Sequence, residues 1–133
     1  MAQRKKFWVF LGAFCFFMIA GGVLAFARDT LQDGQMLRIG DTLKSQNWQY
    51  RLVLQSDGNL VLYNRHRAIW STGTLGKHAK KLMMQSDGNL VLYGTGGPIW
   101  ASNTSGNRDA FVKLQDDGNL VIYKAIWSTG TAK

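Results

Sequence analysis

Hydrophobic and polar residues alternate in short runs along the second part of the chain, and one pattern recurs three times. QSDGNLVLY occupies Gln55–Tyr63 and Gln85–Tyr93, and QDDGNLVIY occupies Gln115–Tyr123, so each copy starts 30 residues after the previous one. Alternation over a few residues is typical of a strand with one buried face. An Asp-Gly step between two such runs is a strong hairpin signal. The chain is therefore predicted to contain three repeated β-hairpin units.

Further strands are expected on either side of these hairpins. Each unit should end in an Ile-Trp strand, at Ile69-Trp70, Ile99-Trp100 and Ile126-Trp127. Two strand-like runs, Gln35–Ile39 and Thr42–Lys44, precede the first unit. No stretch of residues 28–133 shows a sustained helical period, which predicts an all-β domain over that range.

The alternation assigns side chains to faces. On the expected inner face the three tryptophans join Leu52, Leu54, Leu60, Leu62, Leu82, Met84, Leu90, Leu92, Val112, Leu114, Leu120 and Ile122. Burying one such side chain contributes about 1.5–3 kcal/mol, enough in sum to drive folding. Trp48 is expected to be partly in this core. The Gln, Asn, Val and Tyr of each motif should face outward, with Asp at the turn.

The repeated polar residues indicate a binding role. Core packing and turn geometry account for the leucines and glycines, but not for a Gln and a Tyr that return three times. Solvated positions have diverged between the copies, as Val53, Met83 and Lys113 have, and the linkers after each Tyr are dissimilar. Recent duplication, the competing explanation, fits those linkers poorly. A ligand role is therefore favoured over a purely structural one.

The chemistry of the set suits a sugar. Two amides, a carboxylate and a phenol offer mixed hydrogen-bond donors and acceptors for adjacent hydroxyls, beside an apolar valine. Phosphate fits poorly because the only charge is negative, and calcium fits poorly because one carboxylate per site is too few. No metal or other cofactor is expected.

The motif Gln-x-Asp-x-Asn-x-Val-x-Tyr, present three times, resembles the signature of the monocot mannose-binding lectins, the bulb-type or B-lectin family. The likeness covers nearly all of residues 28–133. It implies a β-prism II fold, with three four-stranded sheets around a pseudo-threefold axis and one tryptophan per repeat inside. It also implies metal-independent binding of mannose-containing glycans. Plant members usually carry a disulfide; here Gly58 stands at the first cysteine position and no partner exists.

The resemblance also implies a role for each motif residue. In the first site Asp57 and Asn59 would hold O2 of mannose. Gln55 would reach O3, Tyr63 would reach O4, and Val61 would pack against the ring. The equivalent residues are Gln85, Asp87, Asn89, Val91 and Tyr93 in the second site, and Gln115, Asp117, Asn119, Val121 and Tyr123 in the third. Each shallow site should be weak alone and strong through multivalency. Family dimers often exchange a C-terminal strand, so a homodimer of that kind is an expectation here.

The N-terminal residues 1–27 read as a targeting segment. Three basic residues precede Phe7–Ala27, an uncharged stretch of 21 residues that ends in Ala-Phe-Ala. This is a signal-peptide pattern, and without cleavage the stretch is long enough to anchor the chain in a membrane. Either version predicts a secreted or extracytoplasmic domain at residues 28–133.

Charge and composition weigh against other classes. Residues 28–133 carry 13 basic and 8 acidic residues, a net +5, spread over the surface, so nucleic acid is not an expected partner. Glutamate is absent and each motif holds one aspartate, whereas a glycosidase needs two carboxylates flanking one bond, so an enzyme is not expected. His66 and His78 read as exposed loop residues. An alternative is an antimicrobial or protein-binding module whose basic loops, Arg65–Arg67 and Lys77–Lys81, are the contact surface.

Overall fold

The computed structural model describes residues 16–19, 22–25 and 27–132. Most of the predicted signal or anchor segment, residues 1–27, lies outside the described residues. Within it, Phe16–Ile19 (β1) and Gly22–Ala25 (β2) pair as an antiparallel ribbon. The described part of the chain contains no apolar helix of membrane-crossing length.

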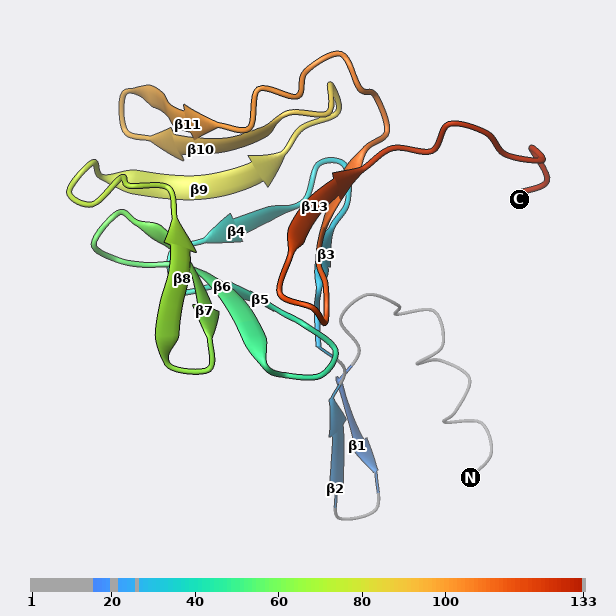
Figure 1. Cartoon of the computed structure of the whole chain (residues 1–133), viewed down its shortest axis with the longest axis horizontal. Helices are drawn as coiled ribbons and strands as arrows, with labels where there is room; N and C mark the ends of the chain where they lie inside the picture. Colours follow the sequence, from blue (N-terminus) through green and yellow to red (C-terminus); the bar gives the residue numbers. More distant parts are fainter. Residues whose placement is uncertain (1–15, 20–21, 26, 133) are drawn as a thin grey trace.

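The three hairpin units build three antiparallel sheets that face one another (Figure 1). The first sheet has the order β5-β6-β7-β8 and consists of Thr42–Lys44, Tyr50–Leu54, Leu60–Asn64 and Arg67–Ser71. The second has the order β4-β9-β10-β11 and consists of Met36–Arg38, Ala79–Met84, Leu90–Gly94 and Gly97–Ala101. The third has the order β3-β12-β13 and consists of Thr30–Leu31, Phe111–Leu114 and Leu120–Tyr123.

The segment before the first repeat supplies one strand to each sheet. Thr30–Leu31 pairs with β12, Met36–Arg38 with β9 and Thr42–Lys44 with β6. Each of these strands turns one leucine inward, and the three leucines, Leu31, Leu37 and Leu43, are fully buried. The strands predicted at Gln35–Ile39 and Thr42–Lys44 are confirmed as β4 and β5. The short strand at Thr30–Leu31 was not predicted. This segment ties the three sheets together.

The core lies between the sheets and consists mainly of leucine. The inward residues of β6, β7, β9, β10 and β12 are buried as the alternation predicts. Most of them are leucines, and Met84 and Val112 take two of the inward positions. Leu120 and Ile122 of β13 are only partly buried and pack against this cluster. The all-β prism predicted from the sequence is confirmed.

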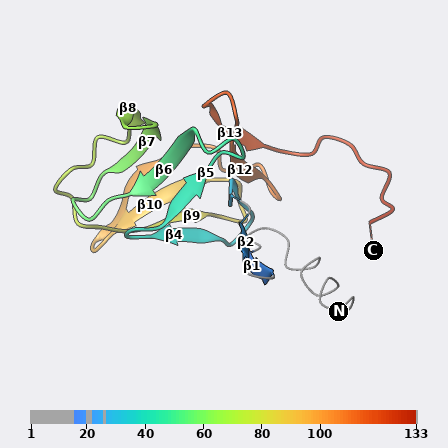
Figure 2. The same cartoon turned by 90° about the horizontal axis from the view of Figure 1, so that it is seen from below.

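The third sheet differs from the expectation of four strands. Ile126–Trp127, predicted to be its last strand, pairs with no other strand, and the chain after β13 extends away from the three sheets (Figures 1 and 2). Ile126 is 94% exposed and Trp127 is 79% exposed. The prediction that this strand joins the core is therefore wrong for the single chain.

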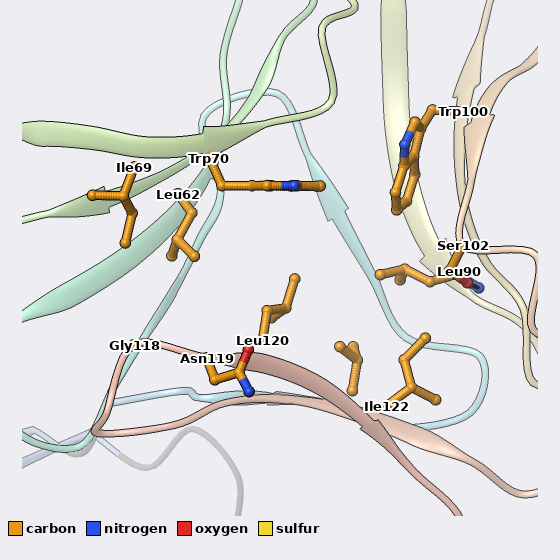
Figure 3. Close-up of a pocket in the computed structure, with 11 residues that line it drawn as sticks. Leu62, Ile69, Trp70, Leu90, Trp100, Ser102, Gly118, Asn119, Leu120 and Ile122 are labelled. Atoms are coloured by element: carbon orange, nitrogen blue, oxygen red, sulfur yellow. Dashed lines mark hydrogen bonds between the residues drawn. The ribbon is translucent and has the colours of Figure 1, made fainter.

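A hollow lies where the third tryptophan was expected. Its volume is about 380 Å³, and its walls are mostly apolar side chains from all three sheets (Figure 3). Trp70 and Trp100 stand at one end, edge to face with ring centroids 5.8 Å apart, and Leu120 and Ile122 lie across from them. Because the space beside it is unfilled, Trp70 is 39% exposed instead of buried. Trp48, expected to be partly in the core, is also exposed.

The glycine of each hairpin turn is required by backbone conformation and by close packing. Gly88 has φ +91°, and a Cβ built there would lie 2.1 Å from the carbonyl oxygen of Asn107. Gly34 has nearly the same φ, +83°, but no heavy atom lies within 4 Å of its Cβ position. Comparing alanine substitutions at Gly88 and Gly34 therefore separates the destabilisation caused by a positive φ from that caused by a steric clash.

Gly88→Ala is expected to lower the free energy of unfolding by roughly 3 kcal/mol or more, because both costs apply. Gly34→Ala, the matched control, should cost about 1–2 kcal/mol, the price of the left-handed conformation alone. Urea denaturation measures both. Equal losses for the two variants would show that the loop after β11 moves aside freely.

Candidate functional site

The three motifs occupy equivalent places at the end of each hairpin. In each, the N–H of Gln donates to the carbonyl of Asn at 2.9 Å, and the glycine N–H donates back to the Gln carbonyl. This closes the three-residue loop that the sequence predicts and places Gln opposite Asn. The aspartate lies between them at the turn. The structure therefore brings Gln, Asp and Asn of each motif together on the outer surface.

A chain of hydrogen bonds links the polar residues of the second motif. The Tyr93 hydroxyl donates to Oε1 of Gln85, and Nε2 of Gln85 donates to Oδ1 of Asp87 at 3.2 Å. The backbone N–H of Asn89 donates to the same Oδ1 at 2.9 Å. The side chains of Tyr93, Gln85 and Asp87 are thus linked to one another and to the backbone of Asn89.

The third motif repeats this chain. Tyr123 donates to Gln115, Gln115 donates to Asp117 at 3.1 Å, and the Asn119 N–H donates to Asp117 at 2.9 Å. The first motif differs in the orientation of its glutamine amide, which donates to the tyrosine instead of accepting from it. Nε2 of Gln55 donates to the Tyr63 hydroxyl at 2.6 Å, while Asp57 still accepts the Asn59 N–H at 3.0 Å.

In the second and third motifs these bonds favour the charged form of the aspartate. The backbone N–H of Asn89, followed by the Gln85 amide, lowers the pKa of Asp87 below its ordinary value of 3.8. The pKa of Asp117 is lowered by the equivalent groups, the Asn119 N–H first and the Gln115 amide second. Hydrogen bonds donated to a carboxylate stabilise its charged form. Both sites therefore present an ionised acceptor at neutral pH.

The asparagines of the first and second motifs are each oriented by a pair of hydroxyl-bearing residues, the hydroxyl pair, that follows the tryptophan strand. Oδ1 of Asn59 accepts from the Thr72 hydroxyl at 3.3 Å and from the Thr74 N–H at 3.2 Å. Oδ1 of Asn89 accepts in the same way from Ser102 at 3.1 Å and from Thr104 at 3.2 Å. Because the oxygen is occupied, the Nδ2 amide is the end left for a ligand.

The third asparagine lacks this support in the described part of the chain. Its counterparts of Thr72 and Thr74 are Thr129 and Thr131, which lie on the segment that extends away from the sheets. Thr129 and Thr131 already bond to each other at 2.7 Å, as Thr72 and Thr74 do at 2.8 Å. Asn119 is exposed, whereas Asn59 and Asn89 are half-buried. The third site is therefore less complete than the other two.

The valines lie on the motif face of each hairpin but are largely buried. Val61 and Val91 lie on the same face as the Tyr of their motif but are only 4% and 3% exposed. Val121 of the third motif is half-buried. These valines face outward as the alternation predicts, but little of the surface of the first two reaches solvent.

The arrangement suits a neutral hydroxylated ligand. One hydroxyl group can donate to Oδ2 of Asp and accept from Nδ2 of Asn at the same time, because both residues lie at one turn. In the second and third motifs this Oδ2 accepts only a long bond from the Gln amide, at 3.4 Å and 3.3 Å. Within the described residues no three His, Cys, Asp or Glu side chains gather closely enough to hold a metal ion.

The surroundings of the three tyrosines differ. The Arg51 guanidinium carbon lies 4.2 Å from the centroid of the Tyr63 ring, and the Lys81 ammonium lies 5.8 Å from that of Tyr93. Tyr123 instead stacks on Phe111, with centroids 5.6 Å apart. A second hollow of about 420 Å³ adjoins the third site and is lined by Thr30, Gln32, Phe111, Lys113, Gln115, Asp116 and Tyr123.

Sequence reasoning missed the hydroxyl pairs and the residues beside the tyrosines. A signal for the pairs exists, because Trp70, Trp100 and Trp127 are each followed by a Ser or Thr at the second position and a Thr at the fourth. No comparable repeat marks Arg51, Lys81 and Phe111, since the three differ in chemistry.

Comparison with known proteins gives matches among solved structures alone. No protein-family model and no curated protein matches the chain. The mannose-specific agglutinin from snowdrop (Galanthus nivalis) bulbs, complexed with methyl-α-D-mannoside, is 41% identical over 79% of this chain and 98% of its own, with a TM-score of 0.70.

Two further structures give the same result. A monomeric monocot mannose-binding lectin from Gastrodia elata is 44% identical over 77% of this chain and 97% of its own, with a TM-score of 0.66. The Polygonatum cyrtonema lectin, complexed with monomannoside, is 34% identical over 78% of this chain and 97% of its own, with a TM-score of 0.69.

Proposed function

Because this chain belongs to the monocot mannose-binding lectin family, we propose that it binds terminal mannose of glycans at its three motifs. The observation that carries the proposal is a recurrent set of bonds: in each motif Tyr bonds to Gln and the Asp carboxylate accepts the Asn N–H, and in the second and third motifs Gln also bonds to Asp. In each motif the Asp carboxylate accepts the backbone N–H of Asn, which fixes the two residues next to each other at the turn. The protein is a carbohydrate-binding lectin, as its structural relatives are, and it is not an enzyme.

Each motif residue has a role in the proposed site. In the second site Asp87 and Asn89 would hold one hydroxyl between them, which the family resemblance assigns to O2 of mannose. Gln85 and Tyr93 would hold the hydroxyls next to it, and Val91 would contact the ring from below. The same roles apply to the equivalent residues of the other two sites. Recognition needs no metal in this scheme, because protein groups satisfy the hydroxyls directly.

Multivalency supplies the useful affinity. Each site is shallow and buries little of a monosaccharide, so a single contact is weak. A branched glycan that engages two sites gains about 10²–10⁴ in apparent affinity when the geometry allows. Three sites on three sheets suit such a ligand. The proposal also includes export of the domain at residues 28–133, supported by the signal pattern of residues 1–27.

The proposal includes a homodimer that exchanges the C-terminal segment. Ala68–Thr74 and Ala125–Thr131 have the identical sequence AIWSTGT. The first copy forms β8 and the support of Asn59, whereas the second is paired with no strand. The open edge of β13, the apolar hollow beside it and the exposed Trp127 are complementary.

The length of the linker favours exchange between two molecules. In the first repeat Tyr63 pairs with Ala68 and Asn64 pairs with Arg67, so the hairpin closes through two residues. In the third repeat only Lys124 separates Tyr123 from Ala125. The shortest common hairpin loops have two residues, so the segment cannot return in the same register on its own chain. A segment with too short a hinge pairs with another copy instead.

Exchange would also complete the third sugar site. Thr129 and Thr131 of a second copy would reach Asn119 as Thr72 and Thr74 reach Asn59, and Trp127 would fill the hollow beside Trp70 and Trp100. The Gastrodia lectin is described as monomeric, so the oligomeric state has to be measured for this chain itself.

Titration with methyl-α-mannoside tests the sugar proposal. In an NMR titration the side-chain amide signals of Gln55, Gln85 and Gln115 should shift saturably, without added metal and in the presence of a chelator. Galactose is the control, because its O2 and O4 configurations differ from those of mannose. Unshifted signals would overturn the proposal, and a protein target whose binding excess mannoside leaves unchanged would favour a protein-binding module.

A further inference from the structure

Two of the three sites carry a pair of cations beside the motif tyrosine. On the outer face of the first sheet, Lys44 pairs across the strands with Arg51, and Arg51 pairs with Tyr63. Side chains of directly paired residues share a face, so these two cations and the tyrosine lie on the face that carries the motif. The Arg51 guanidinium lies over the Tyr63 ring, and the Lys44 ammonium lies over the Trp48 ring at 4.9 Å.

The second sheet repeats the arrangement at the same register. Arg38 pairs with Lys81, and Lys81 pairs with Tyr93. The order of lysine and arginine is reversed between the two sheets, but the two positive charges remain. The Tyr93 hydroxyl is bonded to Gln85 and Lys81 lies over the Tyr93 ring, so only this ring separates the cation from the proposed sugar-binding side chains.

The third sheet has neutral residues at these positions. Phe111 pairs with Tyr123 where Arg51 and Lys81 stand in the other sheets. Gln32 follows Leu31, the partner of Val112, and lines the same hollow as Phe111. Lys113 lies two residues after Phe111 on the same strand, nearer the motif, and forms an ion pair with Asp29 at 3.7 Å. The third site therefore offers an aromatic platform and no free pair of charges.

The cation pairs of the first and second sites have no acidic partner. Lys113–Asp29 is the only ion pair within 4.0 Å among the described residues, so Lys44, Arg51, Arg38 and Lys81 form no ion pair at that distance. Asp41 accepts the backbone N–H of Arg38 at 2.8 Å but forms no such ion pair with its guanidinium. Like charges directly opposite each other on neighbouring strands destabilise a sheet. Packing on Trp48, Tyr63 and Tyr93 orients three of the four side chains but cancels no charge. The same unfavourable pair at equivalent positions of two repeats indicates a ligand that supplies the negative charge.

We propose that the first and second sites select glycans that carry an anionic group, phosphate or carboxylate, next to the bound mannose, and that the third site does not. This inference rests on the proposed sugar binding at the motifs and adds a substrate class to it. The anionic group would lie at the tyrosine end of the site, where the lysine and arginine donate charge-assisted hydrogen bonds to it. Arginine offers a fork that matches both oxyanions, and lysine adds a point charge.

The test compares mannose 6-phosphate, mannuronic acid and methyl-α-mannoside, with inorganic phosphate alone as a fourth ligand. Site-resolved NMR titration follows the amides of Gln55, Gln85 and Gln115 in the full chain. Two ion pairs at an exposed site should make the preferred anionic sugar bind about 2- to 30-fold more tightly than the mannoside at Gln55 and Gln85. The preference should shrink as salt is added. The two anionic sugars distinguish phosphate from carboxylate as the natural group.

Three variants separate the proposal from general attraction to a basic protein. Lys44→Gln with Arg51→Gln should bring the ratio of affinities at Gln55 close to one and leave the ratio at Gln85 unchanged. Lys113→Gln, which removes a cation outside the two pairs, should change neither ratio. Gln32→Lys with Phe111→Arg should create an anionic preference at Gln115.

The outcomes also separate this inference from the sugar proposal. Equal binding of all three sugars at Gln55 and Gln85 would overturn the anionic preference and leave mannose recognition intact. A preference that survives loss of the cation pair, or that inorganic phosphate alone reproduces with full affinity, would overturn it as well. If methyl-α-mannoside bound nowhere, the sugar proposal itself would fail.

Discussion

Asp87→Asn is expected to weaken methyl-α-mannoside binding at the second site by about 10- to 100-fold, while the first and third sites keep their affinity. A hydrogen bond to a charged group is worth about 1.5–3 kcal/mol, and asparagine removes the charge at the oxygen that faces the ligand. The substitution keeps an oxygen that can accept the Asn89 N–H, now 2.9 Å from Asp87, so the turn should persist. NMR titration that follows Gln85 against Gln55 and Gln115 measures the effect.

Asp41→Asn is the matched control. Asp41 also sits at a turn and accepts a backbone N–H, that of Arg38, at 2.8 Å, but it belongs to no motif. Its replacement should leave all three affinities unchanged. An Asp87→Asn protein that binds mannoside at its second site as well as the parent does would show that the carboxylate serves the turn alone.

Replacing Lys124 by Asn-Arg-His-Arg is expected to convert the proposed dimer into a monomer. The variant gives the third repeat the linker of the first, so the C-terminal strand can return through a two-residue turn and pair with β13 of its own chain. Burying the 150–250 Å² of a tryptophan side chain contributes about 4–6 kcal/mol before the entropy of ordering the segment is subtracted. This contribution is the same whether Trp127 fills the hollow of its own chain or of a second copy. Light scattering after size exclusion should therefore give twice the monomer mass for the parent and the monomer mass for the variant.

Trp127→Ala in the parent linker distinguishes exchange from other modes of association. This variant should also be monomeric, but with the hollow open, and its third site should bind mannoside more weakly because Asn119 is left without its hydroxyl pair. The Lys124 replacement should instead keep a strong third site as a monomer. A parent chain that is monomeric at micromolar concentration, or a Trp127→Ala dimer, would contradict exchange.

The dimer and the third site would then be linked thermodynamically. A ligand that binds the completed third site stabilises the exchanged state, because completion requires the second copy. Mannoside at the third site would thus raise the fraction of dimer at a given protein concentration. The first and second sites, whose asparagines are supported within the chain, would contribute nothing to this linkage.

Local sequence determined the repeated unit. The alternation around Asp57-Gly58, Asp87-Gly88 and Asp117-Gly118 fixes short hairpins with one apolar face, because the side-chain period of a strand and the positive φ of the turn are local properties. Gly58 and its equivalents have φ between +91° and +94°, as that turn requires. The same hairpin sets Gln opposite Asn, so the composition of each motif was also readable from the chain alone.

Tertiary structure decided what surrounds each motif. The segment from Thr30 to Lys44 distributes its three strands over three different sheets, and no local pattern says which sheet receives which strand. Cross-strand pairing then places Arg51, Lys81 and Phe111 beside the three tyrosines, although each lies twelve residues before its tyrosine in sequence. These neighbours make the sites differ despite nearly identical motifs.

The last strand shows the same limit most clearly. The sequence AIWSTGT occurs twice, and its propensity for an extended strand is identical in both copies. In the first copy four residues connect it to Tyr63 and it completes a sheet, whereas in the second a single residue connects it to Tyr123 and it stays unpaired. Sequence determined the strand and its chemistry. Only the three-dimensional arrangement decided whether the strand could reach its place, because a chain turns back through a loop of finite length.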